Sequence, residues 1–285
     1  MKQNQLSVII YVNQSNYRSL NLTLKQLPVS NLIQYLIIAD GIDQNLELLI
    51  DHHQDHQIQA FQFPLIGFAK AINQVLKQVD SQYLYFWPLG KTLNFNLLPI
   101  LKLALTLDAN ILMVANPKTL QKHWAKITLI NVDQDFANHP QLATLNDCFF
   151  KTDLHLQFDE RYFITNFSLF LTSFCQNHPE RIYFYNRKIS SNQIHNWHRL
   201  SHWEFNWHYW QLIDFAKTTK LNTKVTINQF VDQLKWLWKW TKKDHHQLDH
   251  HHTKMAFKVC FNHQIKPSVH RIWWKFFQSY FRILL

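Results

Sequence analysis

Glycine is nearly missing from this sequence, and long apolar runs and signs of disulfide bonding are missing altogether. Only 3 of the 285 residues are glycine, against a usual share of about 7%. No run of about 18 apolar residues occurs, so we expect no transmembrane helix. No basic start precedes an apolar segment, so we expect no signal peptide. The 3 cysteines, Cys148, Cys175 and Cys260, are odd in number and far apart, which favours a reducing compartment over a disulfide-stapled secreted domain.

Charged residues are also scarce. Only 17% of the residues are charged, whereas 47% are hydrophobic and 15% are aromatic. This composition is the opposite of that of a disordered chain. A chain of 285 residues can bury a full core, which suits one large domain or one domain with an appendage.

The net charge of +10 is concentrated in the last third of the chain. Residues 1–190 hold 15 basic and 14 acidic residues, whereas residues 191–285 hold 14 basic and 5 acidic ones. The second segment also contains 9 of the 11 tryptophans. We therefore predict two domains, residues 1–190 and residues 191–285, with a boundary near Ser190–Ile194. A basic, Trp-rich module favours an anionic partner such as lipid headgroups, nucleic acid or an acidic protein.

Short apolar runs alternate with helical patterns in the first domain. Strands are predicted at Leu6–Val12, Tyr35–Ala39, Gln57–Phe63, Tyr83–Trp87 and Asn110–Ala115. Helices are predicted at Asn16–Leu27, Leu46–His53, Phe68–Val79 and Phe95–Leu107. This alternation predicts an α/β fold of Rossmann-like type, with a mostly parallel sheet flanked by helices and with ligands at the carboxyl ends of the strands.

The three glycines are informative because they are so few. Gly41 and Gly90 follow predicted strands, and Gly67 precedes a predicted helix. We expect each to adopt positive φ or to lie close to a ligand. The alternative is that they are ordinary turn glycines.

Six stretches, in order over residues 6–190, resemble the family 2 glycosyltransferases, which have the GT-A fold and bind a nucleotide-diphospho-sugar. Ser7–Gln14 (SVIIYVNQ) resembles the family's first strand, Ile37–Asp43 (IIADGID) its IVDDGSTD motif, and Gly67–Asn73 (GFAKAIN) its G-x-x-x-A-R-N helix start. Gln82–Trp87 resembles the strand that leads to the metal-binding DxD motif, Phe158–Phe163 the segment before the catalytic Glu-Asp, and Tyr183–Arg187 a Tyr-rich strand near the end of the domain. The resemblance implies the GT-A fold and a UDP-sugar or another nucleotide-sugar as partner.

The same resemblance implies a set of nucleotide-binding residues. The family's aspartate at the position of Asp40 hydrogen-bonds the nucleotide base, so Asp40 is the leading candidate. The alternative is that Asp40 caps the next helix or turn. The full set of candidates is Tyr11, Asn13, Asp40, Gly41, Gly67, Lys70 and Asn73.

The carboxylates that carry the family's chemistry are missing. Ala39 replaces the first of the paired aspartates, and Pro88-Leu89-Gly90 stands where the family has DxD. No carboxylate occurs between Asp80 and Asp108, and a hard divalent cation needs carboxylate oxygens. Thr165-Asn166 stands at the position of the Glu-Asp general base, and neither side chain takes a proton near neutral pH.

This pattern leaves enzymatic activity open and identifies no catalytic residue. The leading interpretation is a degenerate glycosyltransferase-like protein, an accessory subunit in surface-glycan or glycoprotein assembly that needs no metal cofactor. One alternative is an active, metal-independent inverting glycosyltransferase in which Lys70, Lys91 or Arg187 neutralises the diphosphate of a nucleotide-sugar donor. Another is a non-enzymatic basic interaction module on an α/β fold.

The end of the chain predicts a basic amphipathic helix at Val269–Leu285, of the kind that lies on a membrane surface. The residues expected to contact a membrane or partner are Arg271, Trp273, Trp274, Lys275, Phe277, Phe281 and Arg282. We therefore expect a cytoplasmic protein, peripheral at the inner face of the membrane, whose C-terminal module contacts the membrane surface or a membrane-bound glycosylation partner. The alternative is that this helix packs its aromatic face on the first domain. We do not expect nucleic acid as a partner, because no recognised nucleic-acid-binding fold is present.

Two stretches are rich in histidine, His52–His56 and His245–His252. The second places His246 and His250 one helical turn apart, a spacing that can bind zinc. Because no cysteine lies nearby and the flanks are polar, a solvated linker is the favoured interpretation.

Overall fold

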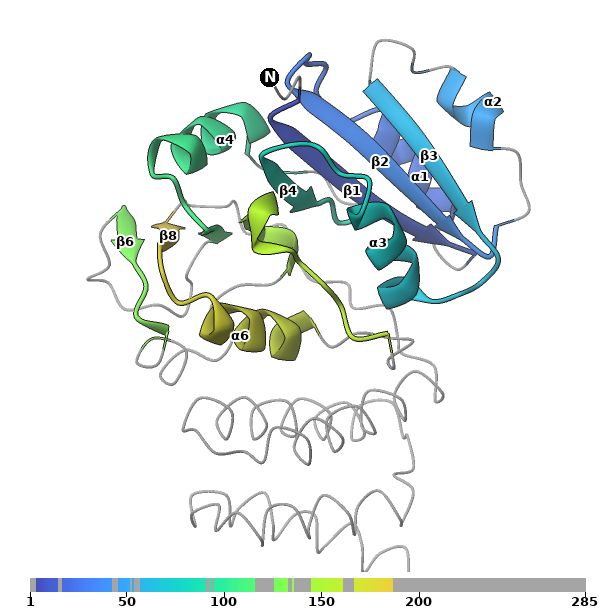
Figure 1. Ribbon diagram of the computed structural model, residues 1–285. Coiled ribbons are helices and arrows are strands. Elements are labelled where there is room, and N and C mark those ends of the chain that lie inside the picture. Colours follow the sequence, from blue (N-terminus) through green and yellow to red (C-terminus); the bar gives the residue numbers. More distant parts are fainter. Residues whose placement is uncertain are drawn as a thin grey trace, which may run out of the picture. The chain divides into compact units, whose positions relative to one another are not determined.

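Short apolar segments form the centre of an eight-stranded sheet in the computed structural model (Figure 1). The structure describes residues 4–14, 17–42, 46–51, 53, 57–90, 93, 95–115, 126–132, 135, 145–160 and 167–186. The chain divides into two units, residues 1–132 with 141–193 and residues 133–140 with 194–285. The second unit lies outside the described residues except for Asp135, so the domain boundary near residue 190 and the C-terminal helices stay predictions.

The strand order is β3-β2-β1-β4-β7-β5-β8-β6. The strands are β1 (Leu6–Asn13), β2 (Ile33–Asp40), β3 (Gln57–Phe63), β4 (Tyr83–Phe86), β5 (Ile111–Ala115), β6 (Ile127–Leu129), β7 (Cys148–Lys151) and β8 (Ile182–Asn186). Strands β1 to β4 pair in parallel with one another, as β5 does with β8, whereas β7 is antiparallel to both its neighbours and β6 is antiparallel to β8. The predicted α/β class with a mostly parallel sheet is confirmed.

Helices cover both faces of the sheet. They are α1 (Leu20–Leu24), α2 (Leu46–Asp51), α3 (Phe68–Leu76), α4 (Leu97–Thr106) and α6 (Phe167–Asn177), with short 3₁₀ turns at Tyr17–Ser19, Leu145–Asp147 and Thr152–Leu154. Helices α1, α2 and α4 bury leucine and isoleucine side chains in one core cluster. Figure 1 shows α1 behind the sheet and α3 in front of it.

Several elements differ from the sequence-based expectation, and β6 and α6 are among those that the sequence did not predict. The helix predicted at Asn16–Leu27 is a 3₁₀ turn followed by the short α1, and Pro28 fits that early end because proline interrupts helices. The antiparallel strand β7 lies between β4 and β5 and was not predicted. Its four residues, CFFK, are too few to show a period.

The directions of the strands indicate at which edge of the sheet a ligand is expected to bind. Strands β2 and β4 lie on opposite sides of β1 and both run parallel to it. After β1 the chain adds β2 and β3 on one side, and it then adds β4 on the other side. At such a topological switch point, α/β sheets have a crevice at the carboxyl ends of the strands. The carboxyl ends of β1, β2 and β4 are Asn13, Asp40 and Phe86.

Asp108, Lys151 and Arg181 form an ion cluster at the end of the sheet where β5 and β8 begin and β7 ends. The Asp108 carboxylate accepts a hydrogen bond of 2.7 Å from Lys151 Nζ and a second from the Arg181 guanidinium. Asp108 and Arg181 have φ values of 45° and 52°, in the left-handed region that non-glycine residues rarely adopt. The hydrogen bond from Lys151, and then the two positive charges, lower the pKa of Asp108.

This cluster predicts a pH-dependent loss of stability. Asp108→Asn tolerates the left-handed backbone but removes the charge. We expect the variant to unfold at lower urea concentration than the parent near neutral pH. Because the folded-state pKa of Asp108 is depressed, its contribution is present above the ordinary aspartate pKa and lost as pH falls through the lowered value. Urea denaturation of both proteins across the acidic range tests this, and a gap that stays constant down to the lowest pH would contradict it. High salt should narrow the gap in urea midpoint at neutral pH, because Asp108 and Arg181 are exposed.

Candidate functional site

Tyr11, Asn13 and Asp40 lie at the carboxyl ends of two adjacent strands. In the parallel pair β1–β2, Asn13 is opposite Asp40 and Tyr11 is opposite Ile38. Alternating residues of a strand point to one face, so Tyr11, Asn13 and Asp40 share one face. The sequence-predicted candidates on β1 and β2 are therefore brought together at the switch point.

The Asp40 carboxylate is fully buried, with 0% of the residue exposed. Oδ1 accepts a hydrogen bond of 2.7 Å from the Ile66 amide, and Oδ2 accepts 2.9 Å from the Gly67 amide and 2.8 Å from the Tyr11 hydroxyl. Gly67 is the N-cap of α3, so the carboxylate lies at the positive end of that helix. Asp40 thus caps the segment before α3. Contact with a nucleotide base stays a prediction.

Tyr11 connects this carboxylate to an aromatic cluster. Its ring packs edge-on against Phe68 with a centroid distance of 4.9 Å, and Phe68 packs against Phe158 at 5.4 Å. Burial, and then the hydrogen bond to Asp40 and its charge, raise the pKa of Tyr11, while a hydrogen bond with Asn13 acts in the opposite direction. The hydroxyl therefore stays protonated at all ordinary pH values and donates a hydrogen bond to the Asp40 carboxylate.

All three glycines adopt positive φ: 69° at Gly41, 88° at Gly67 and 73° at Gly90. This part of the glycine prediction is confirmed. At Gly41 a Cβ would also lie 3.0 Å from the Cβ and Cδ1 atoms of Leu65. The lack of a side chain at Gly41 therefore allows the end of β2 to lie close to Leu65, in the loop before α3.

The loop after β4 packs against α1. Pro88 is buried and Leu89 is half-buried. The Gly90 amide donates a 2.8 Å hydrogen bond to Thr23 Oγ1, and a Cβ on Gly90 would lie 3.0 Å from the Ser19 Cβ. The side chains of Pro88, Leu89 and Gly90 offer no oxygen donor, so they do not fit a hard divalent cation. Across the described ranges, no group of three or more His, Cys, Asp or Glu side chains is placed to hold a metal ion.

Asn73 joins α3 to the segment at Phe158. Its Nδ2 donates to the Phe158 carbonyl at 2.8 Å and to Glu160 Oε1 at 3.0 Å, and its Oδ1 accepts from the Phe158 amide at 2.9 Å. Both amide hydrogens are used by these bonds, and the residue is 6% exposed. The structure gives this nucleotide-binding candidate a fold-stabilising role, and it links two of the six stretches that carry the resemblance.

The other candidates fall into two groups. Lys70 is exposed in the first turn of α3, on the side of the sheet where Asp40 lies. The remaining candidates lie outside the described residues: Lys91, Arg187, Thr165, Asn166, Arg271, Trp273, Trp274, Lys275, Phe277, Phe281 and Arg282.

Sequence reasoning missed the aromatic cluster beside Tyr11. Phe86 packs against Phe158 at 5.8 Å, and Phe158 stacks on Phe170 at 4.2 Å. These rings come from β4, from the segment after β7 and from α6. The unusual 15% aromatic content was a signal for such a cluster, but it does not say which rings meet.

Comparison by sequence identifies no relative. No family model matches the chain, and no curated protein matches it.

Comparison of structures does identify similar folds. Staphylococcus aureus TarS is 14% identical with a TM-score of 0.54, covering 93% of this chain and 50% of TarS. Residues 1–349 of TarS give 13% identity and a TM-score of 0.58, covering 90% of this chain and 80% of that one. The mannosyltransferase PcManGT from Pyrobaculum calidifontis, in complex with GDP-Man and Mn²⁺, gives 10% identity and a TM-score of 0.50, covering 95% and 83%. This chain thus spans half the length of the longer TarS structure, and it has the GT-A glycosyltransferase fold.

The Asn73 contacts predict a large effect on stability. Asn73→Ala leaves the Phe158 amide and carbonyl without their partner, and each buried unpaired group costs about 1–3 kcal/mol. We expect the free energy of unfolding to fall by about 2–4 kcal/mol in urea denaturation. Gln78→Ala is the control, since Gln78 is exposed just beyond α3, and it should change stability by less than about 0.5 kcal/mol. Equal effects of the two substitutions would show that the hydrogen bonds between Asn73 and the Phe158 backbone contribute little to stability.

Proposed function

We propose that this chain is a glycosyltransferase-like protein of family 2 type that binds a nucleotide-sugar and works as a degenerate accessory subunit in surface-glycan or glycoprotein assembly. The loop at Pro88–Gly90 carries the proposal. It occupies the metal-binding position that the resemblance implies, and it packs on α1 without any carboxylate. The chain has the fold, whereas this loop lacks the carboxylate oxygens that would bind a divalent cation in metal-dependent transfer.

A nucleotide-sugar partner is supported by the fold and by its neighbours. The 1–349 portion of TarS has been solved with UDP, at 14% identity and a TM-score of 0.50, covering 94% of this chain and 78% of that one. PcManGT has been solved with GDP-Man. In this chain, Tyr11 and Asn13 would face the base and Lys70 the diphosphate, because all three lie at the carboxyl side of the sheet.

The residue types at the positions of the metal site and the general base support a loss of catalytic activity. Metal activation and base catalysis each contribute large rate factors, about 10² to 10⁴ for the base. Pro88–Gly90 cannot supply the first, and Thr165-Asn166, at the position of the base in the resemblance, cannot supply the second. An active metal-independent transferase remains the second candidate, with Lys70, Lys91 or Arg187 in place of the cation.

The basic C-terminal segment supports attachment to an anionic membrane surface or a membrane-bound partner, because residues 191–285 hold 14 basic and 5 acidic residues. No helix in the described part of the chain is both long and apolar enough to cross a bilayer.

Calorimetric titration of the full chain with UDP, GDP, TDP and UDP-sugars, with and without Mn²⁺, tests nucleotide binding. We expect binding that does not depend on Mn²⁺. Lys70→Met should weaken it about tenfold, as expected for a lost charged hydrogen bond. Lys77→Met is the matched control, since Lys77 is exposed at the other end of the same helix, and it should bind as the parent does.

The outcomes separate the candidate functions. Absence of binding by every nucleotide would overturn the proposal and favour a non-enzymatic interaction module. Binding together with steady release of UDP from a UDP-sugar and an acceptor would favour the active, metal-independent enzyme. Asp40→Ala is a poor probe, because it also releases the Ile66 and Gly67 amides.

A further inference from the structure

The strand β3 forms one outer edge of the sheet and pairs with β2 alone among the described strands. This pairing runs without a bulge along the whole of β3. The 7 residues of the strand, QIQAFQF, include no charge and no proline. Charges, proline, bulges and short length are features that usually prevent an edge strand from pairing with another chain. β6, at the other edge, has only 3 residues, whereas β3 has none of these protective features.

Alternate residues of β3 point their backbone groups away from β2. The Gly41 amide donates a 2.8 Å hydrogen bond to the Phe63 carbonyl, so the backbone of Phe63 faces β2. Successive residues of a strand direct their N–H and C=O groups to opposite sides. The backbone groups of Ile58, Ala60 and Gln62 therefore point outward. Within the described ranges, none of these backbone groups has a hydrogen-bond partner.

This outward row is accessible in its middle. The helix α2, which lies next to β3 in Figure 1, packs Leu46 and Ile50 into the same core cluster as Ile58. The helix thus covers a face of the sheet near the start of β3. Ala60 and Gln62, further along the strand, are exposed, so their backbone groups are open to another strand.

The spacing of the outward residues fits a second copy of this chain. Ile58, Ala60 and Gln62 are symmetric about Ala60, so a two-fold axis there places Ala60 opposite Ala60 of the second copy and Ile58 opposite Gln62. In antiparallel pairing, each such hydrogen-bonded pair exchanges two hydrogen bonds. Because β3 is uncharged, pairing with itself brings no like charges together. Two-fold dimers are also the commonest protein assemblies. We propose that β3 pairs antiparallel with β3 of a second copy and so joins the two sheets into one.

Sedimentation equilibrium of the full chain tests the dimer. One strand pair is a small interface, so we expect a weak dimer whose average mass rises with concentration from one chain towards two. Ala60→Lys places two positive charges opposite each other at the axis, on an exposed position, and should weaken the dimer about fivefold. Gln78→Lys is the matched control, since it adds the same charge at an exposed position after α3, and it should dimerise as the parent does.

Two results of this experiment would overturn the proposal. A dimer that Ala60→Lys and Gln78→Lys affect equally would be formed by another surface. A parent chain that stays monomeric at every concentration would exclude the second copy, and an extended segment of another protein would then be the favoured occupant of the edge.

Oxidative cross-linking tests the register of the two strands. In the proposed pairing, the two Ala60 Cα atoms lie about 5.5 Å apart, within the range that a disulfide bridges. Ala60→Cys should therefore form a covalent dimer under mild oxidation with diamide. Gln59→Cys is the control at the adjacent exposed position, because its two copies would be offset along the strands and about 8 Å apart, too far for a disulfide. The parent, with its own three cysteines, gives the baseline. Equal cross-linking of the two variants above that baseline would contradict the pairing about Ala60.

Discussion

The hydrogen bonds to the Asp40 carboxylate hold the candidate site together. A buried negative charge is costly unless it is well hydrogen-bonded, and here three donors from two segments meet it: the Tyr11 hydroxyl of β1 and the Ile66 and Gly67 amides before α3. The N-terminus of α3 adds a favourable dipole. The position of α3, and with it that of Lys70, depends on a side chain at the end of β2.

Asn73 extends the same framework to the far side of α3. It binds the backbone of Phe158 on both its amide and its carbonyl, and it also binds Glu160. Neither Asp40 nor Asn73 supplies metal binding or base catalysis in this framework. The hydrogen bonds that shape this part of the fold are therefore independent of residues 88–90, which carry no carboxylate.

The sequence predicted the parts of this arrangement that depend on local pattern. The buried runs at β1, β2 and β4 are nearly continuous in apolar residues, and the three glycines marked the turns with positive φ. Partners distant in the sequence could not be predicted in the same way. Asp40 meets Gly67 across 27 positions and Asn73 meets Phe158 across 85.

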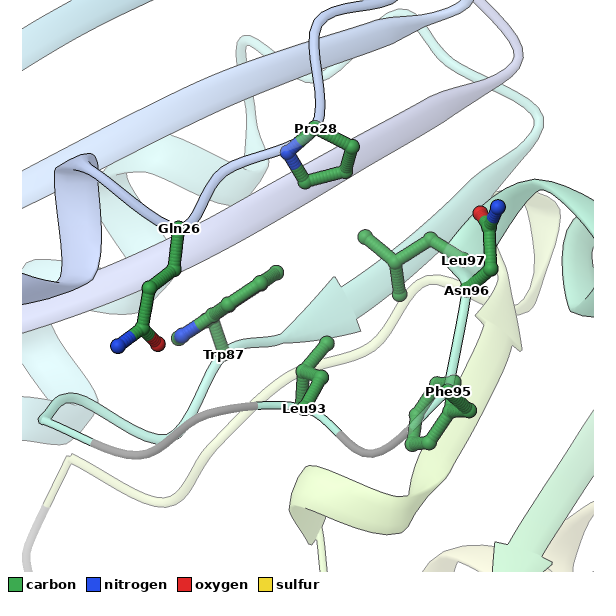
Figure 2. A pocket seen from close by; sticks show the side chains of 7 residues that line it. All are labelled: Gln26, Pro28, Trp87, Leu93, Phe95, Asn96 and Leu97. Atoms are coloured by element: carbon green, nitrogen blue, oxygen red, sulfur yellow. The ribbon is translucent and has the colours of Figure 1, made fainter.

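The loop after β4 packs on α1 and offers no ligand for a metal ion. A metal-binding aspartate must expose its carboxylate to the cation and the phosphates, whereas Pro88 is buried and Gly90 is bonded to Thr23 on α1. Trp87, which precedes this loop, is 4% exposed (Figure 2). An aspartate introduced at position 88, where Pro88 is buried, would bury a charge with no partner, which is strongly unfavourable. Metal binding by this loop would therefore require the whole loop to move, and a single substitution is not enough to create it.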